Sequence, residues 1–412
     1  MTEPERRRRS LTHVGGAIER GGSVKAAELL AHALDVAPAK APEGAADDEP
    51  DRAHVLGFHA YPARMHPTTA RRLVEAFAAP SHVILDPFCG SGTVLVEALL
   101  AGRVAAGSDL NPLAVMLASR KLARHADAEL DQLVASAILA RAFADKRRTH
   151  RAGATHRYGP EDVQTFDPHV LLELDSLRAH VLSLPGGPVR QDLWLVLSAI
   201  LVKVSKKRGD TSAELAPRRL AAGYTSKLFV RKAEELVRRV REFQAALPTP
   251  RPSHRIERDD ATKLPSFQDR SIDVIVTSPP YAATYDYVAH HALRSRWLGL
   301  EASAFEAGEL GARRTYTPLS PTEALEAWEQ ELGSFFAAAH RVLRRGGAMV
   351  LVMADSEVRQ SPIRADDVVR RVAASKDFGP VARASQSRPH FHGSQAFRDA
   401  PRREHALLLE KL

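Results

Sequence analysis

A strand, a glycine-rich loop, a helix and a second strand follow one another over residues 83–107, and this unit constrains the fold more than any other feature. The first strand is the apolar run at residues 83–85. The helix at residues 94–101 is followed by Gly102, a residue typical of helix C-termini. The second strand covers residues 104–107. Because a βαβ unit joins parallel strands by a right-handed crossover, the sequence predicts an α/β protein with a mostly parallel sheet.

The rest of the chain has a long helical stretch between its strand signals. From residue 113 to residue 247, apolar residues recur at helical spacing and no strand is evident. Strands return with the β-branched run at residues 272–276, and the runs at residues 381–385 and 405–409 are expected to form an antiparallel closing pair. The stretch is therefore predicted to be a helical insertion between two halves of one sheet. A helical appendage is predicted at residues 15–34, and a linker follows it.

Composition narrows the class of protein. The formal net charge of +8 and the isoelectric point near 9.7 favour a polyanionic partner. The single cysteine, Cys89, can build neither a disulfide framework nor a thiolate metal site, which fits a reducing cytoplasm. The apolar runs are too short to predict a membrane helix. His290 and His291 have no partner cluster, so we expect helix or surface residues and predict no metal site.

The loop after the first strand is the first candidate site. Glycines there let backbone amides approach a ligand, and the amino end of the following helix favours negative charge. The loop lacks the third glycine of the dinucleotide fingerprint and the lysine of a phosphate-binding loop. A plain tight turn is the alternative. Its sequence is Asp86-Pro87-Phe88-Cys89-Gly90-Ser91-Gly92-Thr93.

Two acidic residues follow neighbouring predicted strands. Asp109 ends the strand after the glycine loop, where a carboxylate can accept both hydroxyls of a ribose. A capping aspartate before Pro112 is the alternative, but the loop before it favours a ribose-bearing cofactor. Asp260, followed by Ala261, ends a third predicted strand. Its carboxylate would accept from an adenine amino group, or else it is a turn aspartate.

The stretch Ser278-Pro279-Pro280-Tyr281 indicates the reaction. It follows the strand at residues 272–276, and two prolines there end the hydrogen-bond ladder. An exocyclic aromatic amine is a poor nucleophile, because its lone pair is delocalised. The Ser278 side chain and the Pro279 carbonyl are suitable acceptors for its N–H groups, and Tyr281 offers a stacking face. A stiff turn or a polyproline ligand is the alternative.

Together these residues resemble the S-adenosylmethionine-dependent DNA amino-methyltransferases. The glycine loop, Asp109 and the Ser-Pro-Pro-Tyr turn look like the family's main motifs, and residues 59–64 look like its additional cofactor segment. The Asp260-Ala261 pair matches its short acidic motif. The similar regions are residues 54–122 and 255–411.

The resemblance implies a Rossmann-like class I methyltransferase sheet, mostly parallel with an antiparallel closing strand, and S-adenosylmethionine as the cofactor. The implied divisions are an extension with a linker (1–50), a cofactor-binding half (51–122), the helical insertion (123–254) and a catalytic half (255–412). The implied catalytic residues are Ser278, Pro279, Pro280 and Tyr281. The implied cofactor-binding residues are His59, Tyr61, Pro62, Asp86, Phe88, Gly90, Ser91, Gly92, Thr93, Asp109, Leu110, Asn111, Asp260 and Ala261.

The resemblance also implies the substrate. A base flipped out of duplex DNA would receive the methyl group directly on its amine, without a covalent enzyme intermediate. Serine before Pro-Pro-Tyr goes mainly with cytosine N4 in this family, whereas aspartate or asparagine goes mainly with adenine N6. Carbon-5 methylation is disfavoured, since the only thiol lies in the cofactor loop. An RNA base and a non-catalytic binding role are alternatives, and a cognate restriction enzyme is a candidate partner.

The helical insertion departs from the family pattern and leaves the place of DNA contact open. Residues 285–314, with Tyr285, are one candidate region for base contacts. A cluster of cations in the insertion could hold phosphates, or it is a solvated helix end. Its members are Lys203, Lys206, Lys207 and Arg208.

Overall fold

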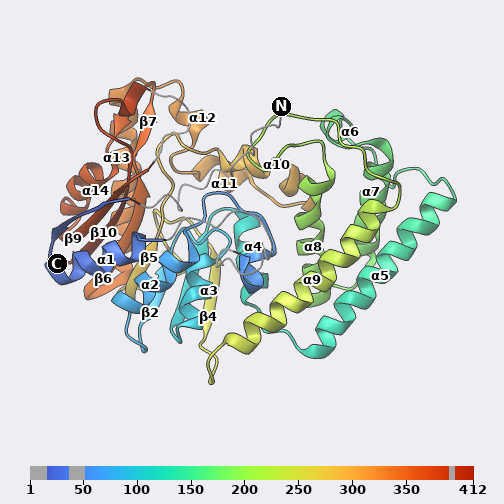
Figure 1. Cartoon of the computed structure of the whole chain (residues 1–412), viewed down its shortest axis with the longest axis horizontal. Coiled ribbons are helices and arrows are strands. Elements are labelled where there is room, and N and C mark those ends of the chain that lie inside the picture. The colour runs from blue at the N-terminus through green and yellow to red at the C-terminus, as the bar shows by residue number, and fades with distance from the viewer. Residues whose placement is uncertain (1–15, 37–51, 389–394) are drawn as a thin grey trace.

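A twisted eight-stranded sheet forms the core of one side of the molecule, and long helices form the other side (Figure 1). The computed structural model describes residues 16–36, 52–388 and 395–412, so the predicted linker and the arginine-rich start lie outside the described residues. The sheet order is β1-β9-β10-β6-β5-β2-β3-β4. The strands are β1 (Ile18–Gly22), β2 (Val83–Asp86), β3 (Val104–Asp109), β4 (His254–Arg258), β5 (Ile272–Thr277), β6 (Leu343–Ala354), β9 (Phe378–Ser387) and β10 (Arg403–Lys411).

The strand directions match the predicted fold class. From β4 to β6 the neighbouring strands pair in parallel, and β10 runs antiparallel to both β6 and β9. This is the mostly parallel, Rossmann-like sheet with an antiparallel closing strand. Side chains alternate between its two faces. Val274 and Val276 pack into the core on one side, whereas Ile275 packs into the core on the other.

Helices cover both faces of the sheet and extend beyond it. Those packed around the sheet and the pocket are α1 (Val24–Leu34), α2 (Pro67–Phe77), α3 (Thr93–Leu100), α4 (Pro112–Leu122), α10 (Tyr287–Leu298), α11 (Ser303–Gly308), α12 (Arg313–Tyr316), α13 (Pro321–Val342) and α14 (Ala365–Ala374). The helical region consists of α5 (Asp127–Thr149), α6 (Pro160–Thr165), α7 (Pro168–Ser183), α8 (Pro188–Val204) and α9 (Tyr224–Ala246). Short elements are η2 (His54–Gly57), η3 (Gln395–Phe397) and the β7–β8 hairpin (Ser356–Val358, Ser361–Ile363). No helix in the described parts of the chain is long and apolar enough to cross a membrane.

One local expectation is wrong. Part of the predicted appendage at residues 15–34 is the strand β1, which pairs antiparallel with β9 and so extends the sheet. Its partner lies at the other end of the chain, and no local pattern marks it. Elsewhere in the sheet, Gly346 and Gly347 lie within β6. Gly346 has a φ of 67°, and the pairing with β5 shifts register there, so they form a bulge.

The helix α10 connects the sheet to the helical region. The indole Nε1 of Trp297 donates to Asp162 Oδ1 at 2.9 Å, and Arg296 Nη2 donates to the same oxygen at 2.8 Å. Arg294 donates to the Ser198 carbonyl at 3.3 Å and pairs with Asp210. The α10 helix follows the Ser-Pro-Pro-Tyr turn in sequence, so the helical region holds the segment next to that turn in place.

Replacing Asp162 with alanine tests this connection. Asp162 is 4% exposed, and its loss leaves the Trp297 N–H buried without its acceptor. We expect the free energy of unfolding to fall by about 2–4 kcal/mol. The control is Glu161→Ala, which also removes a contact to Arg296 but from an exposed carboxylate, and should cost about 0.5 kcal/mol or less. Chemical denaturation measures both, and equal effects would contradict the connection.

Candidate active site

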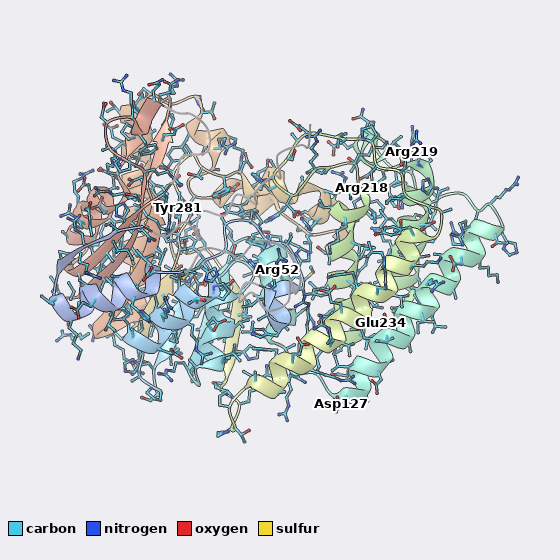
Figure 2. The ribbon with its side chains drawn as sticks, in the orientation of Figure 1. Arg52, Asp127, Arg218, Arg219, Glu234 and Tyr281 are labelled. Carbon is cyan, nitrogen blue, oxygen red and sulfur yellow. The ribbon has the colours of Figure 1, made fainter. Side chains whose placement is uncertain are left out.

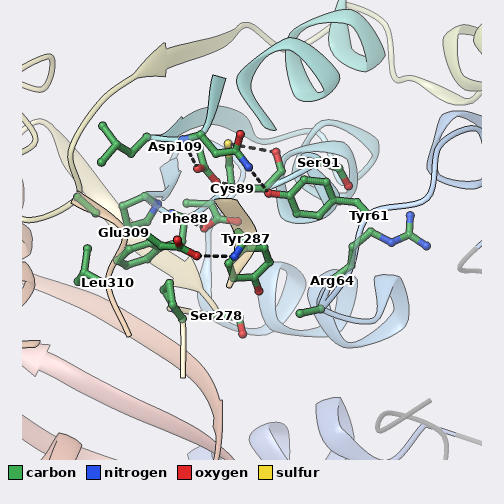
Figure 3. Close-up of a pocket in the computed structure, with 18 of the residues that line it drawn as sticks. Tyr61, Arg64, Phe88, Cys89, Ser91, Asp109, Ser278, Tyr287, Glu309 and Leu310 are labelled. Carbon is green, nitrogen blue, oxygen red and sulfur yellow. Dashed lines mark hydrogen bonds between the residues drawn. The ribbon is translucent and has the colours of Figure 1, made fainter. Parts of the chain in front are cut away.

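An open pocket lies at the carboxyl ends of β2, β3 and β5, and it encloses about 860 Å³ of space, part of which is open to solvent (Figure 3). Ligands of open α/β sheets bind at this edge. Residues from three distant stretches of the chain line it together. The predicted site residues in its lining are Tyr61, Asp86, Phe88, Gly90, Ser91, Thr93, Asp109, Leu110, Asn111, Asp260, Ala261, Ser278 and Pro280.

The remaining predicted residues are not in this lining. His59 is buried, and its Nε2 lies 2.8 Å from Ser198 Oγ of α8. It therefore connects the segment next to the pocket to the helical region. Gly92 caps α3 at a φ of 86°, a conformation that favours glycine. Pro62, Pro279 and Tyr281 also lie outside the lining.

Asp109 shapes the glycine loop. Its Oδ2 accepts from the Gly90 amide at 2.8 Å, and its Oδ1 accepts from the Asn111 amide at 2.9 Å. Gly90 has a φ of 50°, and a Cβ there would lie 3.1 Å from the Tyr61 ring. Burial raises the pKa of Asp109 to about 6. The glycine loop is therefore hydrogen-bonded to Asp109, the carboxylate for which the sequence predicts a role in binding ribose.

Asp86 joins the two halves of the sheet. The Thr277 hydroxyl, at the end of β5, donates to Asp86 Oδ1 at 2.6 Å, and the Phe88 amide donates to the same oxygen at 3.2 Å. Asp86 is 3% exposed, and burial raises its pKa to about 7. The charged form of this carboxylate is thus costly in the protein without a ligand.

The Ser-Pro-Pro-Tyr turn presents Ser278 to the pocket. Ser278 Oγ lies 3.3 Å from the Tyr281 hydroxyl, so the two side chains form one polar unit next to the pocket. Burial raises the pKa of Tyr281, and the phenol therefore stays neutral at physiological pH. Tyr281 is labelled beside the sheet in Figure 2.

Asp260 lies both in a turn and in the pocket lining. It lines the pocket, and its Oδ1 accepts from both the amide and the hydroxyl of Thr262, at 2.9 and 2.6 Å. Lys263 Nζ lies 2.9 Å from Oδ2. Burial acts to raise the pKa of Asp260, but the hydrogen bonds with Thr262 and Lys263 outweigh it, so the pKa lies below its ordinary value. Asp260 is thus a turn aspartate at the wall of the pocket.

Sequence reasoning missed part of the lining. Tyr287 and Glu309 both line the pocket, and Glu309 Oε1 accepts from the Tyr287 amide at 2.6 Å (Figure 3). Burial raises the pKa of Glu309. Gly308 packs so closely that a Cβ there would lie 2.6 Å from the Leu110 side chain. Other lining residues had no individual role assigned to them: Ala63 and Arg64 in the predicted cofactor segment, Pro87 and Cys89 in the predicted loop, Phe305 and Leu310 in the candidate region for base contacts, and Met65 and Val94.

The predicted phosphate-binding cluster is partly neutralised and is not in the pocket lining. Lys206 pairs with Asp167 at 3.2 Å, and Arg208 pairs with Glu214 at 3.4 Å. Burial lowers the pKa of Lys207, whereas Lys203 is exposed.

Tyr285 lies next to the pocket, with its ring centroid 5.4 Å from that of Tyr287.

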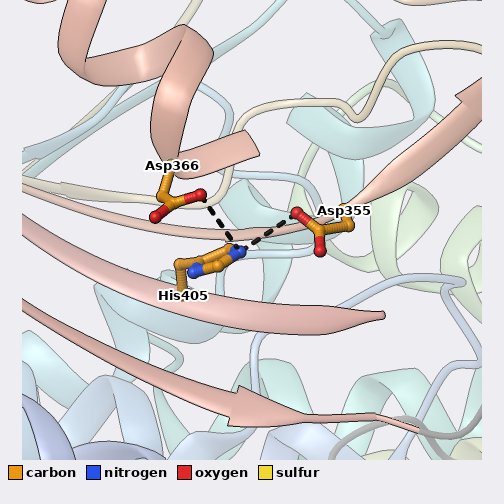
Figure 4. Close-up of side chains that lie close together, drawn as sticks. All are labelled: Asp355, Asp366 and His405. Carbon is orange, nitrogen blue, oxygen red and sulfur yellow. Dashed lines mark hydrogen bonds and ion pairs between the residues drawn. The ribbon is translucent and has the colours of Figure 1, made fainter. Parts of the chain in front are cut away.

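Asp355, Asp366 and His405 form a buried cluster away from the pocket lining (Figure 4). Carboxylates and imidazole could together hold a metal ion. However, Asp355 already accepts from the Ala365 amide at 3.0 Å and from Arg364 at 2.8 Å, and His405 Nε2 lies 3.1 Å away. The cluster therefore acts as a hydrogen-bonded connection between β6, β10 and α14.

The pocket suits a cofactor that carries a ribose, an aromatic base and a positive charge. Asp109 provides acceptors for hydroxyls, and Phe88 provides an apolar wall. Ser91 Oγ is buried in this wall without a hydrogen-bond partner among the described residues. The carboxylates of Asp86, Asp109 and Glu309 would be stabilised by a cationic ligand. S-adenosylmethionine, a sulfonium nucleoside, fits this set of residues.

The fold is a Rossmann-like sheet with a pocket at the carboxyl ends of its parallel strands. A family model described as DNA methylase matches residues 39–120. The Type II methyltransferase M.MvaI of Kocuria varians is 26% identical over 270 residues, which cover 59% of this chain and 57% of that protein. The Type II methyltransferase M.BsoBI of Geobacillus stearothermophilus is 23% identical over 259 residues, covering 56% of this chain and 50% of that protein. The chain thus matches about half the length of these curated relatives.

Among solved structures, a SAM-dependent methyltransferase from Methanosarcina mazei is 11% identical, with a TM-score of 0.32, over 86% of this chain and 99% of that chain. The sequence matches support an amino-methyltransferase of the N4/N6 DNA methylase family. Members of this family use S-adenosylmethionine as methyl donor, in agreement with the predicted cofactor.

Replacing Asp86 with asparagine tests the buried charge. The pKa of Asp86 rises from 3.8 to about 7 on folding, so the folded state binds the proton more tightly, and stability falls as pH rises through this range. Asparagine retains an oxygen for Thr277 and Phe88 but carries no charge. Without cofactor, Asp86→Asn should raise the free energy of unfolding at pH 8 by about 1–3 kcal/mol and change it little at pH 4. Denaturation at both pH values measures this, and a gain that is the same at both would contradict the assignment.

Proposed function

We propose that this protein transfers a methyl group from S-adenosylmethionine to the exocyclic amine of a base in DNA, with cytosine N4 as the target. The observation that supports this most is that Ser278 and Pro280 line the same pocket as Asp109 and the glycine loop. A methyl donor held by the loop would therefore lie within reach of an amine held at the turn. When bound, S-adenosylmethionine supplies an electrophilic methyl group.

The residues at the turn suit an amine that attacks directly. Ser278 Oγ and the Pro279 carbonyl would accept from the two N–H groups of the base and orient its lone pair towards the methyl group. Tyr281 stays neutral and is bonded to Ser278, so it would act as a stacking face and a support rather than as a base. The proton leaves the amine after the attack, so no acid–base triad is required.

Serine at position 278 supports cytosine N4 over adenine N6. In the family that these motifs resemble, serine at this position goes mainly with cytosine N4, whereas aspartate or asparagine goes mainly with adenine N6. The Ser278 hydroxyl lies 3.3 Å from the Tyr281 hydroxyl at the turn.

The base would reach the pocket by flipping out of the duplex, because the pocket lies inside the protein and a paired base cannot enter it. Exposed cations of the helical region would contact the phosphates. Arg218 and Arg219 are exposed and lie in the helical region, across the molecule from Tyr281 in the view of Figure 2. Together with the exposed Lys203 they are candidates for these contacts, whereas Lys206 and Arg208 are ion-paired. A cognate restriction enzyme stays a prediction.

A methyl-transfer assay tests the proposal. The protein is incubated with a library of duplex DNA and cofactor labelled in the methyl group, and the product is digested to nucleosides. We expect the label in N4-methylcytosine. Label in N6-methyladenine would overturn the assignment of the base, and label in tRNA but not in DNA would overturn the substrate. Absence of label from every nucleic acid would overturn the function.

Variants of Asp109 and Tyr281 test the division of roles. Asp109→Ala removes the acceptor of the Gly90 amide and should mainly weaken cofactor binding. Tyr281→Ala should leave cofactor binding intact and lower turnover through lost base stacking, worth about 1–3 kcal/mol. Tyr281→Phe, which keeps the ring and removes only the hydroxyl, should lose less. Calorimetry and single-turnover rates separate the two effects, and identical losses in both variants would contradict these roles.

A further inference from the structure

Asn111 lies in the wall of the pocket, directly after the strand that ends at Asp109. It is 2% exposed, and its side chain has three neighbours. The Leu113 amide lies 3.0 Å from Oδ1, the Tyr61 hydroxyl lies 3.3 Å from Nδ2, and His291 Nδ1 lies 2.8 Å from Nδ2. One amide group thus connects the pocket wall to the helix α10.

These contacts fix the orientation of the Asn111 amide. A backbone N–H can only donate, so the atom that faces Leu113 must be the oxygen. The amide nitrogen therefore faces Tyr61 and His291. Since this nitrogen can only donate, His291 Nδ1 must accept, and His291 carries its proton on Nε2.

Accepting from Asn111 is the one hydrogen bond that the His291 side chain makes among the described residues. It is 1% exposed, and its ring centroid lies 4.9 Å from that of Tyr61 and 6.0 Å from that of Tyr287, both in the pocket lining. Its Nε2 is buried and has no hydrogen-bond partner among the described residues. A buried donor without an acceptor destabilises the fold, so an aliphatic residue would be the more stable choice if His291 served packing alone.

The surroundings keep His291 neutral. Burial lowers its pKa well below the ordinary value, and Arg294, His290 and Lys207 act in the same direction. Protonation of Nδ1 would remove the acceptor that Asn111 needs. The neutral ring is therefore the form that supports the pocket wall.

We propose that His291 is a positioning residue for the cofactor pocket. Its Nδ1 fixes the Asn111 amide, and this amide in turn fixes the Tyr61 hydroxyl in the pocket lining. This inference rests on the proposed function for the identity of the cofactor, though not for the hydrogen bonds. Its consequence is that the helix following the catalytic turn controls how well the pocket binds its cofactor.

Two substitutions separate the acceptor from the ring. His291→Phe keeps a ring against Tyr61 but has no acceptor for Asn111. His291→Asn loses the ring but places a carbonyl oxygen where Nδ1 lies. Calorimetry with S-adenosylmethionine should show affinity weakened about tenfold in His291→Phe and restored to within about threefold in His291→Asn. The turnover number at saturating cofactor should change less than twofold in either variant.

The tautomer of His291 is measured in the unliganded wild-type protein, by a two-bond ¹H–¹⁵N correlation spectrum after labelling the histidines with ¹⁵N. The His291→Asn spectrum assigns the signal. We expect the proton on Nε2. A proton on Nδ1 would overturn the inference whether or not the cofactor is correct. Equal loss of affinity in both variants would also overturn it, since the ring and not the acceptor would then matter. If the wild-type protein bound no S-adenosylmethionine, the proposed function would fall, while the tautomer would still decide the hydrogen-bond chain.

Discussion

The parallel pairing of β5 with β2 is the constraint on which the site depends. Ile84 pairs with Val274, and the Thr277 hydroxyl bonds Asp86 at 2.6 Å where the two strands end. Because both strands end at the same edge, the glycine loop and the Ser-Pro-Pro-Tyr turn open into one pocket. The helical region does not disturb this arrangement. It lengthens the crossover from β3 to β4, and these strands lie at one edge of the sheet, so the chain leaves and returns without separating β2 from β5.

The parts of the fold that could be predicted are those with local signals. The strand before the glycine loop, the strand before the prolines and the closing pair each have a pattern within a few residues. The strand β1 has no such pattern, since its partner β9 lies more than 300 residues away. The presence of Glu309 and Gly308 in the pocket lining was not predicted, for the same reason. Their partners, Tyr287 and Leu110, are set by tertiary packing. The predicted cation cluster shows the converse, because counting charges could not reveal the ion pairs that neutralise much of it.

The helix α10 gives the helical region a part in the site. Its first residue, Tyr287, lines the pocket, and its last turn is held by Asp162 of α6 through Trp297. In between, Arg294 contacts the Ser198 carbonyl of α8. The helix α10 therefore connects the pocket lining to two helices of the helical region.

The charges of the protein are divided between its surface and its pocket. The chain as a whole is strongly basic, with a net charge of +8, yet three carboxylates with raised pKa values line the pocket. A basic surface attracts a polyanion, and an acidic cavity attracts a cation, so the two substrates of the proposed reaction are drawn to different places. Burial raises the pKa of all three carboxylates, to about 7 for Asp86 and about 6 for Asp109, so their charged forms are disfavoured without a ligand. The bound cation would then favour their ionised form, and the affinity of the pocket for its cofactor would be coupled to the release of protons.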